Sequence, residues 1–86
     1  MLTAFLHQPV ILDLDAPYLA IGTLVAVDAD SVTLADCDLH DHREANSTKE
    51  VYAIETRQLG VRANRRRVVI PRTQIVACSL LAEVIG

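Results

Sequence analysis

Short runs in which apolar and polar residues alternate fill the first half of the chain. Apolar residues take every second position in Val10–Leu14 and recur through Tyr18–Asp28 and Val32–Leu39. A period of two is typical of a β-strand with one buried face. Turn-forming residues separate the runs, at positions 15–17 and in Asp28–Ser31. The sequence therefore predicts three consecutive antiparallel strands joined by tight turns.

Gly22 lies in the middle of the second predicted strand. A glycine at such a position permits a sharp bend or a β-bulge, which a small barrel needs. Ahead of the first strand, we expect Met1–Leu6 to form one helical turn and Pro9 to force the chain to extend.

The next part of the chain is less regular. Asp41–Lys49 is polar without periodicity, so we expect a loop there. Glu50–Val61 is predicted as a fourth, longer strand. Because its apolar residues fall on both parities, we expect this strand to bend or to have both faces partly covered.

The last third predicts one more strand. A short turn at Ala63–Arg65 precedes the fifth strand, Arg66–Ile70, which Gln74–Cys78 could extend, and Ser79–Ile85 has helical spacing for one or two turns. Five short strands with polar connections and no long helical pattern predict a mainly β protein. We expect one domain, residues 1–86, folded as a small, five-stranded, strongly bent antiparallel barrel.

Composition changes this picture in one respect. Hydrophobic residues make up 51% of the chain, yet there are only one Phe, two Tyr and no Trp. The core must therefore be aliphatic, and the aliphatic content is large for an 86-residue chain. Either neighbouring subunits cover part of this apolar surface, or the chain is a well-packed aliphatic monomer.

Two motifs resemble those of a known family. Gly22-Thr-Leu-Val-Ala-Val-Asp28 follows the first alternating strand, and Val61-Arg62-Ala63-Asn64 leads into Arg67-Val68-Val69-Ile70-Pro71. This order of an apolar strand, a Gly-x-Leu strand ending in Asp, a third strand and an Arg-x-Asn turn resembles the Sm/LSm family. The chain is identified as a divergent member, of bacterial or phage type, over roughly residues 5–76.

The resemblance implies an assembly and a function. Members build small bent barrels whose edge strands pair between subunits, so we expect a homo-oligomeric ring of five to seven subunits, with six or seven favoured. The resemblance also implies that pore-side loops bind single-stranded RNA. The residues that would contact RNA are Arg62, Asn64, Asp30, Ser31, Arg65 and Arg66.

An alternative function stays open, that of a structural ring or adaptor that has kept the fold and lost the RNA pocket. Asp30 would present a negative charge where a base and phosphate should approach, and Ala63 replaces the glycine of the family pattern. Fold alone does not transfer an activity.

Four arginines, Arg62, Arg65, Arg66 and Arg67, lie within six residues. Guanidinium groups bind phosphate in bidentate geometry and stack on bases, which suits single-stranded nucleic acid. Residues 1–42 hold seven acidic side chains and no Lys or Arg, whereas residues 43–86 hold eight basic and four acidic ones. The arginines could therefore equally pair with the acidic half or with neighbouring subunits.

The run Asp36-Cys37-Asp38-Leu39-His40-Asp41-His42 invites a metal hypothesis, because on a strand Asp36, Asp38, His40 and His42 share one face. A strand end exposed to solvent explains the same residues without a metal. With no second ligand cluster in the sequence, we expect neither a resident metal nor a cofactor.

Other classes of protein have little support. Cys78 and Ser79 have no neighbouring base in a recognisable arrangement, so we do not expect an enzyme. Two isolated cysteines do not make a disulfide framework. No signal peptide or membrane-spanning run is visible, and we expect a cytoplasmic protein.

Overall fold

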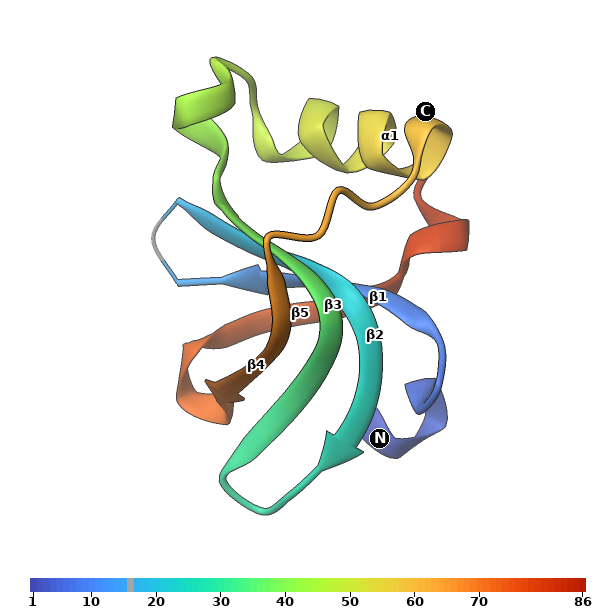
Figure 1. Cartoon of the computed structure of the whole chain (residues 1–86), viewed down its shortest axis with the longest axis vertical. Helices are drawn as coiled ribbons and strands as arrows, with labels where there is room; N and C mark the ends of the chain where they lie inside the picture. The colour runs from blue at the N-terminus through green and yellow to red at the C-terminus, as the bar shows by residue number, and fades with distance from the viewer. Residues whose placement is uncertain (16) are drawn as a thin grey trace.

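The computed structural model describes residues 1–15 and 17–86, in which five antiparallel strands form one strongly bent sheet (Figure 1). The strands are β1 (Pro9–Leu14), β2 (Tyr18–Val27), β3 (Ser31–Asp41), β4 (Arg65–Pro71) and β5 (Ile75–Leu80). Their order in the sheet is β4-β3-β2-β1-β5, so β4 and β5 form its two edges and the sheet is not closed. The predicted five-stranded, bent antiparallel architecture is confirmed. The turn predicted at 15–17 includes residue 16, which lies outside the described residues.

One α-helix and four short 3-10 helices complete the chain. They are η1 (Leu2–Phe5), η2 (His42–Ala45), α1 (Lys49–Leu59), η3 (Arg72–Gln74) and η4 (Leu81–Glu83). The expected helical turn at the N-terminus is confirmed as η1. In Figure 1, α1 lies at one end of the bent sheet, and the turn that joins β2 to β3 lies at the opposite end.

The prediction of a strand at Glu50–Val61 is wrong, because this segment is mostly α1. The side chain of Thr48 accepts a hydrogen bond from the Val51 N–H at 3.2 Å, which caps the first turn. Gly60, at φ 94°, ends the helix. Only one face of α1 is buried, with Tyr52, Ala53 and Thr56 pointing inward. The mixed parity of the apolar residues therefore follows from helical periodicity.

The predicted extension of the fifth strand is also wrong. Strand β4 ends at Pro71, η3 turns the chain, and β5 then pairs with β1 at the other edge of the sheet. Proline has no N–H to continue the ladder, so it stops the strand. The helical spacing predicted for Ser79–Ile85 is realised only in the single turn of η4, since residues 79 and 80 belong to β5.

The sheet has a hydrophobic core on each face. Buried residues of the inner core are Val10, Leu12, Leu14, Ala20, Leu24, Val32, Leu34, Cys37 and Ile70, and η1 packs against them. Buried residues of the outer core are Ile11, Leu19, Ile21, Tyr52, Ala53 and Leu81. Alternate residues of β1 and β2 thus face opposite cores, and α1 with the C-terminal segment covers the outer one.

Gly22 lies where β2 meets an irregularity in β3. The pairing register shifts between Ile21 and Thr23, and the facing Asp36 has a left-handed backbone, with φ 49°. A Cβ atom at Gly22 would lie 2.9 Å from the carbonyl oxygen of Ala35. The bend predicted at this glycine therefore depends on close contact between two backbones.

Candidate nucleic-acid interface

The residues predicted to bind RNA lie at the two ends of β3. We call the β2–β3 turn with η3 the loop end, and the last part of β3 with α1 and residues 60–64 the helix end. Asp30 and Ser31 lie at the loop end. Arg62 and Asn64 lie at the helix end, beyond α1.

The predicted residues therefore do not form one site within a subunit. Asn64 bonds to Leu39, which lies eight residues from Ser31 and so roughly 26 Å away along β3. The turn predicted at Ala63–Arg65 between two strands is wrong, since residues 60–64 connect α1 to β4 and Arg65 begins β4.

At the loop end, Asp30 and Ser31 meet Arg72 of η3, a residue that the sequence analysis did not single out. The Arg72 N–H donates to the Asp30 carbonyl at 2.9 Å, and the Arg72 guanidinium donates to the Asp28 carbonyl at 3.1 Å. The carboxylates of Asp28 and Asp30 remain exposed. The loop end thus combines one half-buried arginine with two exposed aspartates. The signal for it in the sequence was Pro71, which marks a strand end rather than a strand interior.

Asn64 has a structural role at the helix end. Its side-chain oxygen accepts from the Leu39 N–H at 3.0 Å, and its side-chain nitrogen donates to the Leu39 carbonyl at 2.9 Å. Its own N–H donates to the Cys37 carbonyl at 2.9 Å. Asn64 therefore continues the pairing of β3 beyond β4, and its amide is occupied with backbone.

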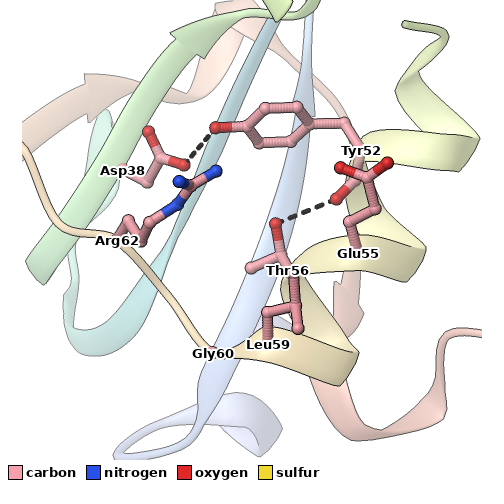
Figure 2. Close-up of a pocket in the computed structure, with 7 residues that line it drawn as sticks. All are labelled: Asp38, Tyr52, Glu55, Thr56, Leu59, Gly60 and Arg62. Atoms are coloured by element: carbon pink, nitrogen blue, oxygen red, sulfur yellow. Dashed lines mark hydrogen bonds between the residues drawn. The ribbon is translucent and has the colours of Figure 1, made fainter.

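A cluster of polar side chains lies between the outer face of β3 and α1 (Figure 2). The Tyr52 hydroxyl donates to the carboxylate of the buried Asp38 at 2.5 Å. The rings of Tyr52 and His40 stack with centroids 4.9 Å apart and planes at 22°. His40 Nδ1 lies 3.7 Å from the other Asp38 oxygen. Burial, and then the hydrogen bond to Asp38, raise the pKa of Tyr52, so the hydroxyl keeps its proton and remains a donor.

Arg62 reaches over this cluster from the connection that follows α1. In Figure 2 its guanidinium points toward the Tyr52–Asp38 hydrogen bond. Its charge lowers the pKa of Tyr52, against the larger effects of burial and Asp38. A groove of about 350 Å³ opens beside it, lined by Asp38, His40, Tyr52, Arg62 and Asn64.

The three consecutive arginines, Arg65, Arg66 and Arg67, begin β4 and are all exposed. Within the described part of the chain, no carboxylate pairs with them or with Arg62; the arginine–carboxylate ion pair found there joins Arg43 to Asp41 at 2.8 Å. The described carboxylates of the acidic first half therefore form no ion pair with these four arginines.

The Asp36–His42 run does not present one face. Asp36 has a left-handed backbone, and β3 ends before His42, whose Nδ1 bonds to the Ser47 carbonyl. Only Asp38 and His40 come together, at Tyr52. Among residues 1–15 and 17–86, no group of three or more His, Cys, Asp or Glu is placed to hold a metal ion.

Across the same residues, no helix has the length and apolar character needed to cross a membrane.

The fold is similar to that of proteins with two different roles. An Sm protein of Pyrococcus abyssii, solved in complex with a uridine heptamer, superposes with a TM-score of 0.62 at 19% identity, over 92% of this chain and 90% of that one. A chain of the NatC complex bound to a Gag peptide and CoA superposes with a TM-score of 0.60 at 20% identity, over 93% and 90%. No protein-family model and no curated sequence matches the chain. The Sm-like fold that the sequence predicted is confirmed.

Proposed function

We propose that the chain binds single-stranded RNA as a subunit of a homo-oligomeric ring. The similar Sm protein of Pyrococcus abyssii was solved with a uridine heptamer, which supports this class of ligand. The observation that carries the proposal is the set of four exposed arginines from Arg62 to Arg67, none of which pairs with a carboxylate among the described residues. Unpaired guanidinium groups on one segment bind a phosphate backbone well.

The two edges of the sheet support the ring. Strands β4 and β5 each have one neighbour in the sheet, and Val69 and Val76 on them are 61% and 72% exposed. Unpaired, apolar edges favour pairing with another chain. We expect β4 of one subunit to pair with β5 of the next, in a closed ring of five to seven subunits, with six or seven favoured.

In a ring, the loop end and the four arginines would each be repeated once in every subunit. Asp30 and Ser31 with Arg72 form one RNA-facing loop cluster in this proposal, and Arg65 and Arg66 provide charge near the subunit junction. Asn64 holds the Arg62 segment against β3 and acts as a positioning residue.

A second candidate function is a structural subunit of a protein complex. The similarity to a chain of the NatC complex supports it, because the overlap is nearly as close as that with the Sm protein. The exposed carboxylates of Asp28 and Asp30 also repel phosphate at the loop end.

Light scattering followed by fluorescence anisotropy with a labelled oligouridine separates the two functions. We expect a ring that binds oligouridine at low salt, with log K falling with log salt by about 0.7 for each phosphate contact. Replacing Arg65 and Arg66 together by Ala should weaken binding about tenfold or more and reduce the salt slope.

Arg57→Ala is the matched control, since Arg57 is an exposed arginine on α1 that bonds the Gly86 carbonyl and lies outside the four-arginine segment. Asp30→Asn should strengthen binding, because it removes a carboxylate from the loop end. An intact ring in which neither the parent nor Asp30→Asn binds at low salt would favour the structural subunit.

A further inference from the structure

We propose that the groove at the helix end binds one nucleotide of single-stranded RNA whose base carries an exocyclic amino group. This inference rests on the proposed RNA binding and adds a second contact site, at the opposite end of β3 from the loop end. The site exists because α1, inserted between β3 and β4, forms one of its walls.

The size of the groove suits one nucleotide. Its volume of about 350 Å³ lies at the lower end of the range for small-ligand sites, about 300–1,000 Å³. Three different segments line it: the end of β3, the first turns of α1 and the connection that holds Arg62.

His40 provides a flat surface for a base. Tyr52 lies behind it and is fixed by its hydrogen bond to Asp38, so the stacked imidazole has a defined orientation. The His40 side chain is 30% exposed, whereas Tyr52 is 7% exposed. His40 Nε2 is buried and has no hydrogen-bond partner among the described residues. Stacking on an aromatic ring is the usual way in which proteins hold unpaired bases.

The charges around the groove match a nucleotide. Arg62 is exposed and free of a carboxylate ion pair among the described residues, so it can bind the phosphate. Asp38 has acceptor capacity beyond its bond to Tyr52, because an ionised carboxylate accepts several hydrogen bonds. An amino group of cytosine or adenine is a donor for such a bond. Uracil has no amino group and would place a carbonyl oxygen against the carboxylate.

The test compares labelled oligocytidine with oligouridine of equal length, by anisotropy at low salt on the full chain in its native oligomeric state. We expect oligocytidine to bind roughly five- to tenfold more tightly. His40→Ala and Arg62→Gln should each weaken oligocytidine binding by about tenfold and abolish the preference. Ultraviolet cross-linking of oligocytidine should label peptides that contain His40 or Tyr52.

Arg57→Gln removes a charge from α1 outside the groove and should leave both affinities unchanged. If His40→Ala fails to fold, His40→Gln keeps a polar side chain and removes the ring. Equal affinities for the two oligonucleotides, unchanged in the variants, would overturn the groove site and leave the proposed RNA binding in place. No binding of either oligonucleotide by the intact oligomer would overturn both.

Discussion

At the loop end of β3, the aspartate side chains are exposed and Arg72 donates to two backbone carbonyls of the β2–β3 turn. At the helix end, Asp38 is buried and bonds a tyrosine, with a histidine ring stacked alongside. Both ends contain an arginine near aspartate. At the loop end the arginine bonds backbone, whereas at the helix end the aspartate accepts from a buried tyrosine on a covering helix. The difference indicates that an inserted element can build a second polar site on a fold whose turns are short.

The largest expected effect comes from Gly22, where β2 crosses the β3 irregularity between the two ends. Gly22→Val would place a Cβ 2.9 Å from the Ala35 carbonyl oxygen and 3.1 Å from the Cys37 Cα. Both contacts are with backbone, so relief requires the strands to separate, and we expect a loss of stability of about 3 kcal/mol. The expected result is little soluble, folded protein, measured by yield and circular dichroism.

Thr23→Val is the control, because it puts the same side chain on the adjacent, half-buried position of β2. A Gly22→Val protein as soluble and stable as the parent would mean that the bend does not depend on this close approach.

The second prediction tests the comparison between the two ends directly. Tyr52→Phe keeps the ring but leaves the buried Asp38 carboxylate without its hydroxyl donor, so the free energy of unfolding should fall by about 2 kcal/mol. Arg72→Ala removes a hydrogen bond to the exposed Asp28 carbonyl, and should lower it by only about 0.5 kcal/mol. Urea denaturation of both variants gives the two values. Equal losses would mean that burial does not distinguish the two ends.

The sequence predicted the β2–β3 part of the loop end better than the helix end, whereas η3 was missed at the loop end. The three strands β1 to β3 follow sequence runs with a period of two, and a short turn joins β2 to β3, so local pattern and final structure agree there. The bend at Gly22 was predicted because glycine adopts conformations that other residues avoid. In the structure, a glycine is required there because the backbone of β3 leaves no room for a Cβ atom.

The helix end could not be predicted because α1, which forms part of it, was predicted as a strand. Thr48 and Gly60 bracket α1 as N-cap and C-cap, and helix-forming residues such as Lys49, Glu50 and Gln58 lie between them. These local signals favour a helix, whereas apolar residues on both parities are also compatible with a bent strand. Proximity of His40 to Tyr52 could not be predicted, since it arises only when α1 packs on the outer core.

The smallest expected effect concerns Cys37, which lies in the inner core between the two ends and is fully buried. Burial, and then the neighbouring Asp38 carboxylate, raise the pKa of the Cys37 thiol from 9.0 to about 11. The unfolded chain therefore releases this proton at lower pH than the folded one does. The contribution to stability is complete below about pH 9 and is lost as the pH rises toward 11.

At pH 10 this difference lowers the free energy of unfolding by about 1 kcal/mol relative to pH 8. Cys37→Ala removes the titrating thiol, so its stability should change less between the two pH values, although the lost packing makes it less stable at both. Urea denaturation of the two proteins at pH 8 and pH 10 measures the difference in slope, and effects of other titrating groups cancel in that comparison. Parallel pH dependence in the parent and Cys37→Ala would show that folding does not raise the pKa of the Cys37 thiol. Neither burial in the inner core nor the Asp38 carboxylate would then have a measurable effect on it.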